Sequence, residues 1–515
     1  PSPTPRPTHL AQECIVTATS HLIDGAVRAS TGEATQAVYN PATGETIAQL
    51  ELGSVADVDT AVASAAAAYE TWSQFSLSKR TAVLFKFREL LAAGTDELAV
   101  IVSREHGKVI SDAKGEIGRG LEVVEFACGL AQLLKGEYSE QAATGIDVFS
   151  VREPIGVVAG ITPFNFPVMV PMWMAPVAIA CGNAFILKPS ERDPSASLFL
   201  ADLWTKAGLP DGVFNVVQGD REVVDALLHH DDIAAISFVG STPIAKYIHS
   251  EASAQGKRVQ ALGGAKNHGV VLADADLDDA VNHLTAAAFG AAGERCMALS
   301  VAVVEDSIAD ELVARLAQKA REVLVTAGDQ PGADMGPVIT PAAKERIEGL
   351  ITSAVDQGAQ VVVDGRNFTV PGYENGFFVG PTVVDHVKAE HTVYIEEVFG
   401  PVIDVVRVSG LDEAIDVINA NPYGNGTAIF TSSGEAARTF RRRVQVGMIG
   451  VNVPVPVPVA WHSFGGWRDS LFGESHIYGP EGVKFYTRGK VTTQRWPHRT
   501  EASTASFHFS GDSQK

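Results

Sequence analysis

Apolar segments alternate with helical segments in the middle of the first half of the chain. Strand-like runs occupy residues 155–161, 184–187, 213–217 and 234–239, and helical patterns occupy residues 172–180, 196–207 and 221–228. This alternation is typical of βαβ units, whose right-handed crossovers build a parallel sheet. We therefore expect an α/β fold with ligands at the carboxyl edge of the sheet.

A second alternation begins near residue 270. It predicts strands at residues 270–272, 361–363, 382–384 and 402–408, and helices at residues 277–289, 308–323, 341–357 and 436–443. A chain of 515 residues is too long for one ordinary core, so a second α/β domain is expected here.

Other segments differ from this alternation. The pattern of residues 21–52 predicts strands and turns that form a hairpin. Helical patterns occupy residues 55–69, 78–93, 96–105 and 110–128. Residues 137–153 look like a strand excursion, and a late strand is expected around Phe485, Tyr486 and Val491. Alternate prolines make residues 453–458 an extended loop.

Charge and hydropathy indicate which kinds of binding partner and which compartment to expect. The formal net charge of −21 disfavours nucleic acid and anionic membrane surfaces, because both bind Lys and Arg. No apolar run is long enough to span a bilayer, and the proline-rich start has no apolar signal core. We expect a cytoplasmic protein with terminal tails at residues 1–20 and 497–515.

The four cysteines, Cys14, Cys128, Cys181 and Cys296, are far apart and form no CxxC pair, which suits a reducing compartment. Cys296 follows a run of small residues and Arg295, whose positive charge would favour a thiolate. The local sequence fits a reactive thiol and a small buried cysteine equally well.

No GxGxxG motif opens a βα unit, but two other junctions suit an adenine dinucleotide. Lys188 and Glu191 follow one strand, and a carboxylate there can accept from a ribose 2′-hydroxyl. Ser241 follows another strand at a helix start, where backbone N–H groups suit a pyrophosphate. Each junction could also be a plain turn.

Asn165 lies among prolines and aromatics directly after a strand. An amide donor fixed by rigid neighbours is what a developing oxyanion needs, although asparagine is also common in turns.

Five motifs in this order resemble the NAD(P)-dependent aldehyde dehydrogenase superfamily. They are Phe164-Asn165-Phe166-Pro167, the pair Lys188 and Glu191, Phe238-Val239-Gly240-Ser241, Cys296, and Glu397-Val398-Phe399-Gly400-Pro401. The resemblance implies that Cys296 attacks an aldehyde, that Asn165 holds the oxyanion and that NAD accepts hydride. It also implies cofactor contacts by Thr162, Phe164, Lys188, Glu191, Arg192, Ser241, Gly263 and Glu397.

The chain departs from that superfamily at one position. Leu262 stands where the family's ELGGK segment has the glutamate that activates the deacylating water, and leucine cannot take a proton. A thiol such as coenzyme A could replace water as the nucleophile.

Three segments resemble the CoA-acylating methylmalonate-semialdehyde dehydrogenase branch: residues 118–122, 265–268 and 293–299. The branch implies oxidation of methylmalonate or malonate semialdehyde, with decarboxylation, to propionyl-CoA or acetyl-CoA. In it Arg119 and Arg295 would bind the substrate carboxylate, although helical periodicity alone makes Arg119 a solvated residue. A hydrolytic aldehyde dehydrogenase and a non-catalytic member of the fold are the alternatives.

The resemblance also implies a domain plan. Residues 21–136 and 154–265 would form a Rossmann-type NAD-binding domain, and residues 266–479 the catalytic domain. Residues 137–153 and 480–496 would form a small β segment that pairs subunits into a homodimer or homotetramer. No metal site is expected, because the adjacent residues His229, His230, Asp231 and Asp232 diverge on any element.

Overall fold

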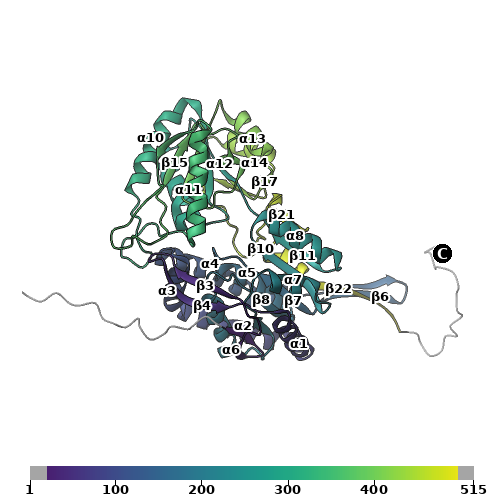
Figure 1. Ribbon diagram of the computed structural model, residues 1–515. Coiled ribbons are helices and arrows are strands. Elements are labelled where there is room, and N and C mark those ends of the chain that lie inside the picture. The colour runs from purple at the N-terminus through teal and green to yellow at the C-terminus, as the bar shows by residue number, and fades with distance from the viewer. Residues whose placement is uncertain (1–19, 497–515) are drawn as a thin grey trace, which may run out of the picture.

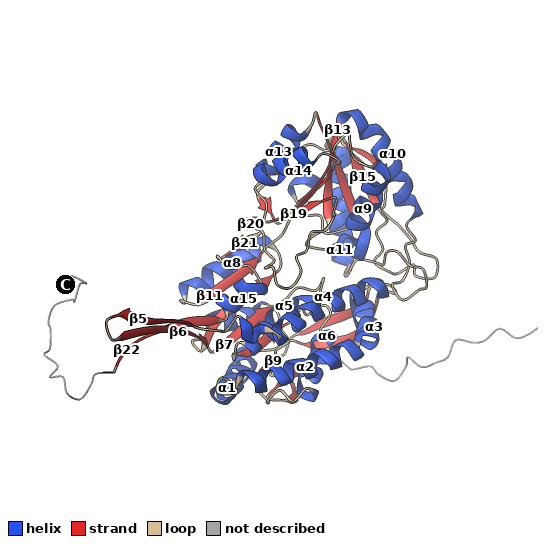
Figure 2. Cartoon of the chain, turned by 180° about the vertical axis from the view of Figure 1, so that it is seen from behind, coloured by secondary structure: helices blue, strands red, loops and turns tan. Residues whose placement is uncertain are grey.

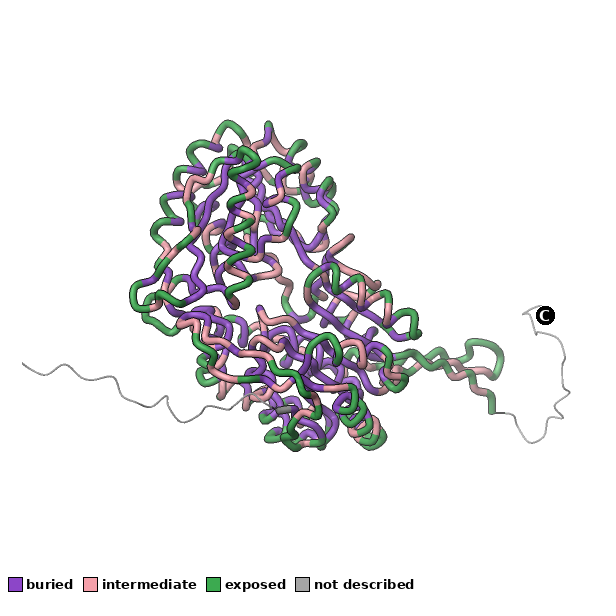
Figure 3. The backbone as a smooth tube through the Cα atoms, viewed as in Figure 1, coloured by how far each residue is buried: buried purple, intermediate pink, exposed green. Residues whose placement is uncertain are grey.

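The computed structural model describes residues 20–496, so the expected tails, apart from Ser20, and Cys14 lie outside the described residues. Two α/β lobes lie one above the other, and a thin β arm projects from the lower lobe (Figure 1). Both lobes have buried interiors, whereas the arm is mostly exposed (Figure 3). The α/β class predicted from the strand and helix alternation is confirmed.

The first lobe is built on an eight-stranded sheet in the order β2-β1-β9-β8-β7-β10-β11-β21. Its strands are β1 (Ser20–Ile23), β2 (Ala26–Ala29), β7 (Val157–Ile161), β8 (Ala184–Lys188), β9 (Phe214–Val216), β10 (Ile233–Val239), β11 (Arg258–Leu262) and β21 (Leu471–Phe472). The strands β7 to β11 are parallel, and antiparallel strands close both edges. The strand β21 comes from the residues assigned by sequence to the second domain.

Helices cover both faces of this sheet, as parallel strands require. Its helices are α1 (Val55–Trp72), α2 (Leu77–Ala93), α3 (Thr95–His106), α4 (Ile110–Cys128), α5 (Met169–Ala180), α6 (Ser195–Lys206), α7 (Arg221–His229) and α8 (Thr242–Ala254). Val158 and Phe185 pack in the core that α2 to α6 share, and Val157 and Ala184 pack against α1, α7 and α8. Every residue of α5 is buried, which explains its continuous apolar sequence.

The second lobe has a seven-stranded sheet in the order β14-β15-β16-β13-β12-β18-β19. Its strands are β12 (Asn267–Val271), β13 (Leu299–Glu305), β14 (Gln360–Val363), β15 (Thr382–Asp385), β16 (Val402–Val408), β18 (Gly426–Phe430) and β19 (Met448–Val451). Its helices are α9 (Leu277–Phe289), α10 (Asp306–Glu322), α11 (Pro341–Asp356), α12 (Thr392–Ile395), α13 (Leu411–Ala420) and α14 (Gly434–Arg443). The expectations from sequence omit β13, β18, β19, α12 and α13.

The arm is a three-stranded antiparallel sheet that both figures show extending away from the lobes (Figures 1 and 2). Its strands are β5 (Glu137–Ala143), β6 (Ile146–Pro154) and β22 (Thr487–Arg495), in the order β22-β6-β5. Two small antiparallel sheets complete the fold: the hairpin of β3 (Thr35–Asn40) and β4 (Glu45–Glu51), and the pair of β17 (Tyr423–Gly424) with β20 (Trp467–Arg468).

The expected strand at Phe485 and Tyr486 is wrong in its first part. Residues Gly479–Phe485 form the helix α15, Tyr486 caps it, and the strand begins only at Thr487. Pro480 in the first turn favours a helix start. Both aromatic side chains are buried in the core of the first lobe, so tertiary packing outweighs their preference for strands.

Asn183 joins the first sheet to this C-terminal segment. Its side chain is fully buried, and its Oδ1 accepts from the N–H groups of Ile155 (2.8 Å) and Gly156 (3.1 Å). Its Nδ2 donates to the carbonyls of Ala178 and Tyr486, both at 3.0 Å.

Replacing Asn183 with Ala would leave buried backbone groups without partners. Each such group costs about 1–3 kcal/mol, so we expect Asn183→Ala to destabilise the protein by about 3 kcal/mol or more. A urea titration followed by tryptophan fluorescence measures the loss. The control Asn375→Ala, at an exposed position, should shift the midpoint little. Equal midpoints for the two variants would contradict this role.

Candidate active site

Cys296 lies on a tight loop between α9 and β13. The loop contains the turn η2 (Gly290–Gly293), in which Ala291, Ala292 and Gly293 all have positive φ angles of 50°, 52° and 73°. A Cβ atom on Gly293 would lie 2.0 Å from the carbonyl oxygen of Gly400, so only glycine fits there. The small residues that precede Cys296 therefore serve the backbone path of its loop.

Two asparagines hold the backbone of Cys296. The Nδ2 groups of Asn267 and Asn425 each donate to the carbonyl oxygen of Cys296, both at 2.9 Å. Asn267 also donates to Ala298 (3.0 Å) and accepts from the N–H of Gly426 (2.9 Å). The sequence did not predict either asparagine contact, because asparagines in strands and turns give no local signal of a distant hydrogen-bond partner.

The Cys296 thiol is half-buried and free. Burial, followed by the negative charge of Glu397, raises the pKa of this thiol to about 12, and Arg295 opposes the shift more weakly. Arg295 does favour the thiolate, as expected from sequence, but its effect is smaller than those of burial and of Glu397. Burial therefore favours the neutral thiol over the thiolate.

Arg295 is anchored to the first lobe. Its Nη2 pairs with Asp112 Oδ1 of α4 at 2.7 Å, and the other carboxylate oxygen of Asp112 accepts from the N–H of Ala291 at 2.9 Å. Asp112 thus ties α4 to both ends of the loop that carries Cys296.

Asn165 lies on the loop after β7 and is buried. Its carbonyl oxygen accepts from Lys108 Nζ at 2.6 Å, which fixes its backbone. Phe164, next to it, packs edge-on against Phe399 with ring centroids 5.8 Å apart. The EVFGP segment and the segment around Asn165 are therefore in contact, although 234 positions separate Asn165 from Phe399.

Arg119 lies on α4, seven residues beyond Asp112, and its side chain is 32% exposed. Its guanidinium pairs with Glu122 at 2.8 Å and donates to the carbonyls of Pro458 (2.8 Å) and Val457 (3.2 Å). The Tyr478 hydroxyl donates to the same Pro458 carbonyl at 3.0 Å. Helical periodicity alone predicts that Arg119 is solvated. The structure differs from that prediction, because Arg119 holds the proline-rich loop of the second lobe.

The candidate cofactor residues follow four neighbouring strands of the first sheet. Thr162 follows β7, Glu191 follows β8, Ser241 follows β10 and Gly263 follows β11, while Lys188 ends β8. These strands are adjacent in the order β8-β7-β10-β11, so their carboxyl ends share one edge.

The side chains at this edge are polar, and within residues 20–496 some of their polar groups have no hydrogen-bond partner. Lys188 Nζ contacts Glu191 Oε2 at 3.1 Å, and the hydroxyl of Thr162 is buried without a hydrogen-bond partner. Ser241 precedes the first turn of α8 and makes no capping bond with its side chain. The Arg192 guanidinium lies 4.9 Å from the centre of the Phe164 ring.

Glu397 reaches this edge from the second lobe. Its Oε1 accepts from the N–H of Ala265 at 3.0 Å, and burial raises the pKa of its carboxyl to about 7. Lys266 holds the preceding turn by donating to the carbonyls of Val393 (2.6 Å) and Glu396 (3.1 Å).

Leu262 ends β11 and is buried in the apolar core of the first lobe. Glu294 is the nearest acid in sequence to Cys296, but its carboxylate is fully buried, accepts from the N–H of Ile339 (3.3 Å) and lies 3.8 Å from His106. Burial raises the pKa of Glu294 to about 8. Glu294 therefore belongs to the interior beneath the loop.

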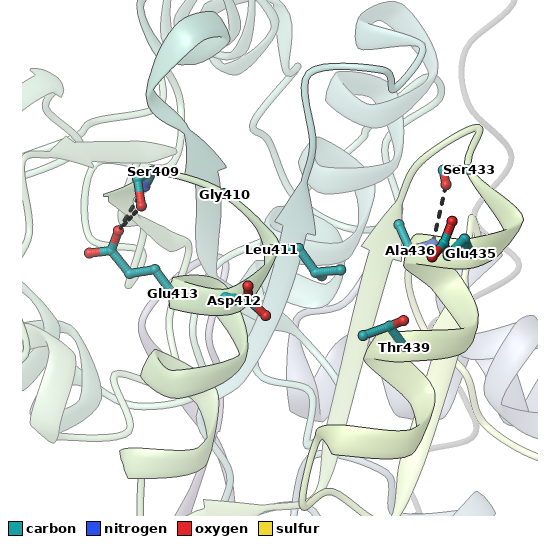
Figure 4. Close-up of a pocket in the computed structure, with 9 residues that line it drawn as sticks. All are labelled: Ser409, Gly410, Leu411, Asp412, Glu413, Ser433, Glu435, Ala436 and Thr439. Carbon is teal, nitrogen blue, oxygen red and sulfur yellow. Dashed lines mark hydrogen bonds between the residues drawn. The ribbon is translucent and has the colours of Figure 1, made fainter.

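A separate hollow of about 500 Å³ lies on the second lobe between the first turns of α13 and α14 (Figure 4). It is lined by Ser409, Gly410, Leu411, Asp412, Glu413, Ser433, Glu435, Ala436 and Thr439. Ser409 donates to Glu413, and Ser433 accepts from the N–H of Ala436 (Figure 4). Ser433 caps the start of α14, acidic side chains are favourable at both helix starts, and the lining includes none of the candidate site residues.

Two findings concern the described residues 20–496 as a whole. No helix there combines the length and apolar character that a membrane crossing needs. In the same part of the chain, no three His, Cys, Asp or Glu side chains gather so that they could bind a metal ion.

Comparisons with known proteins agree with this geometry. The model of the aldehyde dehydrogenase family matches residues 27–492. A malonate-semialdehyde dehydrogenase of Pseudomonas aeruginosa is 55% identical over 490 residues, which cover 95% of this chain and 98% of the relative.

Solved structures are similar over nearly the whole chain. A methylmalonate-semialdehyde dehydrogenase from Oceanimonas doudoroffii has a TM-score of 0.92 and 57% identity, covering 94% of this chain and 99% of that one. A protein from Sinorhizobium meliloti assigned the same activity, in complex with NAD, has a TM-score of 0.92 and 52% identity, covering 93% and 98%. The resemblance and the aldehyde-dehydrogenase-like fold expected from sequence are confirmed, and the chain belongs to the aldehyde dehydrogenase family of oxidoreductases.

Proposed function

We propose that this enzyme oxidises malonate semialdehyde or methylmalonate semialdehyde with NAD and transfers the acyl group to coenzyme A. The relatives from Pseudomonas aeruginosa and Oceanimonas doudoroffii carry names for these substrates. The observation that carries the choice of CoA is Leu262, a buried apolar side chain where a hydrolytic enzyme needs a base.

The first-sheet edge fits NAD. Glu191 is partly exposed beside Lys188, so its carboxylate can accept from a ribose hydroxyl and would repel a 2′-phosphate. The free Thr162 hydroxyl and the start of α8 at Ser241 can donate to phosphate and amide oxygens. We propose that Phe164, Arg192, Gly263 and Glu397 complete this site. Bound NAD⁺ would accept a hydride with its electron pair.

Cys296 and Asn165 would carry the acylation step. The Cys296 sulfur, as its thiolate, forms a bond to the aldehyde carbon, and the carbonyl electrons move onto oxygen. The amide of Asn165 donates to that oxyanion and stabilises it. When the oxyanion collapses, the C–H bond breaks with loss of hydride, and a thioester remains on Cys296.

The chain's own residues then determine how the thioester is released. The β-carboxylate of the acyl group leaves as CO₂, its electron pair stays on the α-carbon, and that carbon takes a proton. A CoA thiolate attacks the thioester carbon, the bond to Cys296 breaks, and acetyl-CoA or propionyl-CoA leaves. Water competes poorly, because Leu262 supplies no proton acceptor.

Arg119 and Arg295 would hold the substrate carboxylate. Both guanidiniums are partly exposed, and each has N–H donors beyond those that their present partners use. Arg119 has the looser pairing, since Glu122 is itself 41% exposed. A bidentate guanidinium would orient the semialdehyde with its aldehyde toward the thiol.

We also propose that the chain forms a homodimer or homotetramer through residues 137–153 and the strand β22. The arm exposes Tyr138 (60%), Val151 (38%) and Val491 (68%), and within residues 20–496 the outer edges of β5 and β22 pair with no further strand. A three-stranded sheet with open edges can gain by pairing with another chain. Cys128, Cys181 and Cys296 are free thiols, which supports a reducing compartment such as the cytoplasm.

Omitting CoA from the assay should lower the steady rate of NADH formation. With malonate semialdehyde and NAD⁺, we expect one rapid burst of NADH per active site and then a steady rate at least about 10-fold lower than with CoA. Absorbance at the NADH band and thioester formation are followed together. An undiminished steady rate without CoA, with free acid as the product, would identify a hydrolytic enzyme instead.

Substituting Arg119 or Arg295 should discriminate between substrates. Arg119→Met and Arg295→Met should lower kcat/KM for malonate semialdehyde by about 10- to 100-fold more than for propanal, because a charged hydrogen bond contributes about 1.5–3 kcal/mol. Steady-state kinetics on both aldehydes measures this difference. Arg88→Met, which removes the surface pair with Glu125, is the control and should affect neither substrate. Equal losses on both aldehydes would argue against a carboxylate clamp.

A further inference from the structure

A fully buried ion pair lies behind the Asn165 loop. Lys108 Nζ and Glu116 Oε2 are 2.7 Å apart, and neither side chain is exposed. Lys108 lies between α3 and α4, and Glu116 lies in the second turn of α4. Sequence reasoning missed both residues.

Both members of the pair contact the same loop. Lys108 donates to the carbonyl of Asn165 at 2.6 Å, and its ammonium lies 4.4 Å from the centre of the Phe166 ring. The second oxygen of Glu116 accepts from the N–H groups of Val168 (2.8 Å) and Met169 (3.1 Å). The pair therefore holds the loop at Asn165 itself and again where α5 begins.

The buried Lys108–Glu116 pair is expected to add little net free energy to the stability of the fold. Taking two charges out of water costs about as much as their attraction returns, and packed apolar residues in their place are often as stable. The pair offers instead a rigid frame of charged hydrogen bonds, which are short and directional. An oxyanion donor needs such a frame, because a small displacement loses most of its effect.

We propose that Lys108 and Glu116 are positioning residues that aim the Asn165 amide at the oxyanion. Neither group touches the substrate in this role. Lys108 fixes the backbone carbonyl of Asn165, and Glu116 fixes Lys108 together with the far end of the loop. The inference rests on the proposed oxyanion role of Asn165.

A double-mutant cycle tests it. Glu116→Gln keeps the shape and one acceptor for Val168 and Met169 but removes the charge that holds Lys108. Asn165→Ala removes the amide, and the third protein carries both changes. The readouts are the acylation burst with malonate semialdehyde that carries hydrogen or deuterium on its aldehyde carbon, NAD⁺ affinity by fluorescence titration, and the rate of Cys296 alkylation by iodoacetamide.

We expect Glu116→Gln to slow acylation by about 10- to 100-fold, which is part of the roughly 100- to 1,000-fold that loss of an oxyanion donor costs. The deuterium isotope effect should stay or rise, while NAD⁺ affinity and Cys296 alkylation change less than about 2-fold. In the Asn165→Ala background the same substitution should slow acylation by less than about 2-fold, since the amide is already gone.

Lys114→Met on α4 is the matched control, because Lys114 pairs with Asp96 at the surface, and it should leave acylation unchanged. Lys108→Arg, which keeps the charge, should be milder than Lys108→Met. Equal losses from Glu116→Gln in both backgrounds, or parallel losses of NAD⁺ affinity, would overturn the positioning role. If Asn165→Ala alone leaves acylation unchanged, the proposed role of Asn165 fails instead.

Discussion

One face of α4 contacts each of the three loops that make the candidate site. Asp112, Glu116 and Arg119 are spaced at i, i+4 and i+7, so they lie on one side of the helix over about 10 Å. Asp112 binds the loop of Cys296, Glu116 the loop of Asn165, and Arg119 the proline-rich loop that ends at Pro458. These loops come from both lobes, so a shift or rotation of α4 would move Cys296, Asn165 and the proline-rich loop together.

Burial sets the chemical character of the site. It raises the pKa of Cys296, of Glu397 and of Glu294, which favours the neutral form of each group. The same exclusion of water strengthens each hydrogen bond to a developing oxyanion. Leu262 stands in place of a base, so a thioester on Cys296 would be protected from hydrolysis in a site that excludes water. An incoming thiol could then attack it.

Local pattern predicts much of this fold, because buried parallel strands and amphipathic helices leave periodic signals. The helix at residues 110–128 and the strands β7, β8 and β10 follow directly from such signals. The helix α15 does not, since its aromatic residues prefer strands in isolation and gain their helix by packing on α5. Within the site, motifs point to Cys296 and Asn165. The supporting contacts of Lys108, Glu116 and Asn425 join residues about 50 to 130 positions apart, which no local pattern encodes.

The central claim is that a thioester on Cys296 persists until CoA removes it. Mass spectrometry of the peptide that contains Cys296, after rapid mixing with malonate semialdehyde and NAD⁺ and acid quenching, tests this directly. The account predicts one acetyl or malonyl group on Cys296 in most molecules without CoA, and its loss within a turnover when CoA is added. An unmodified Cys296 beside accumulating free acid would contradict it.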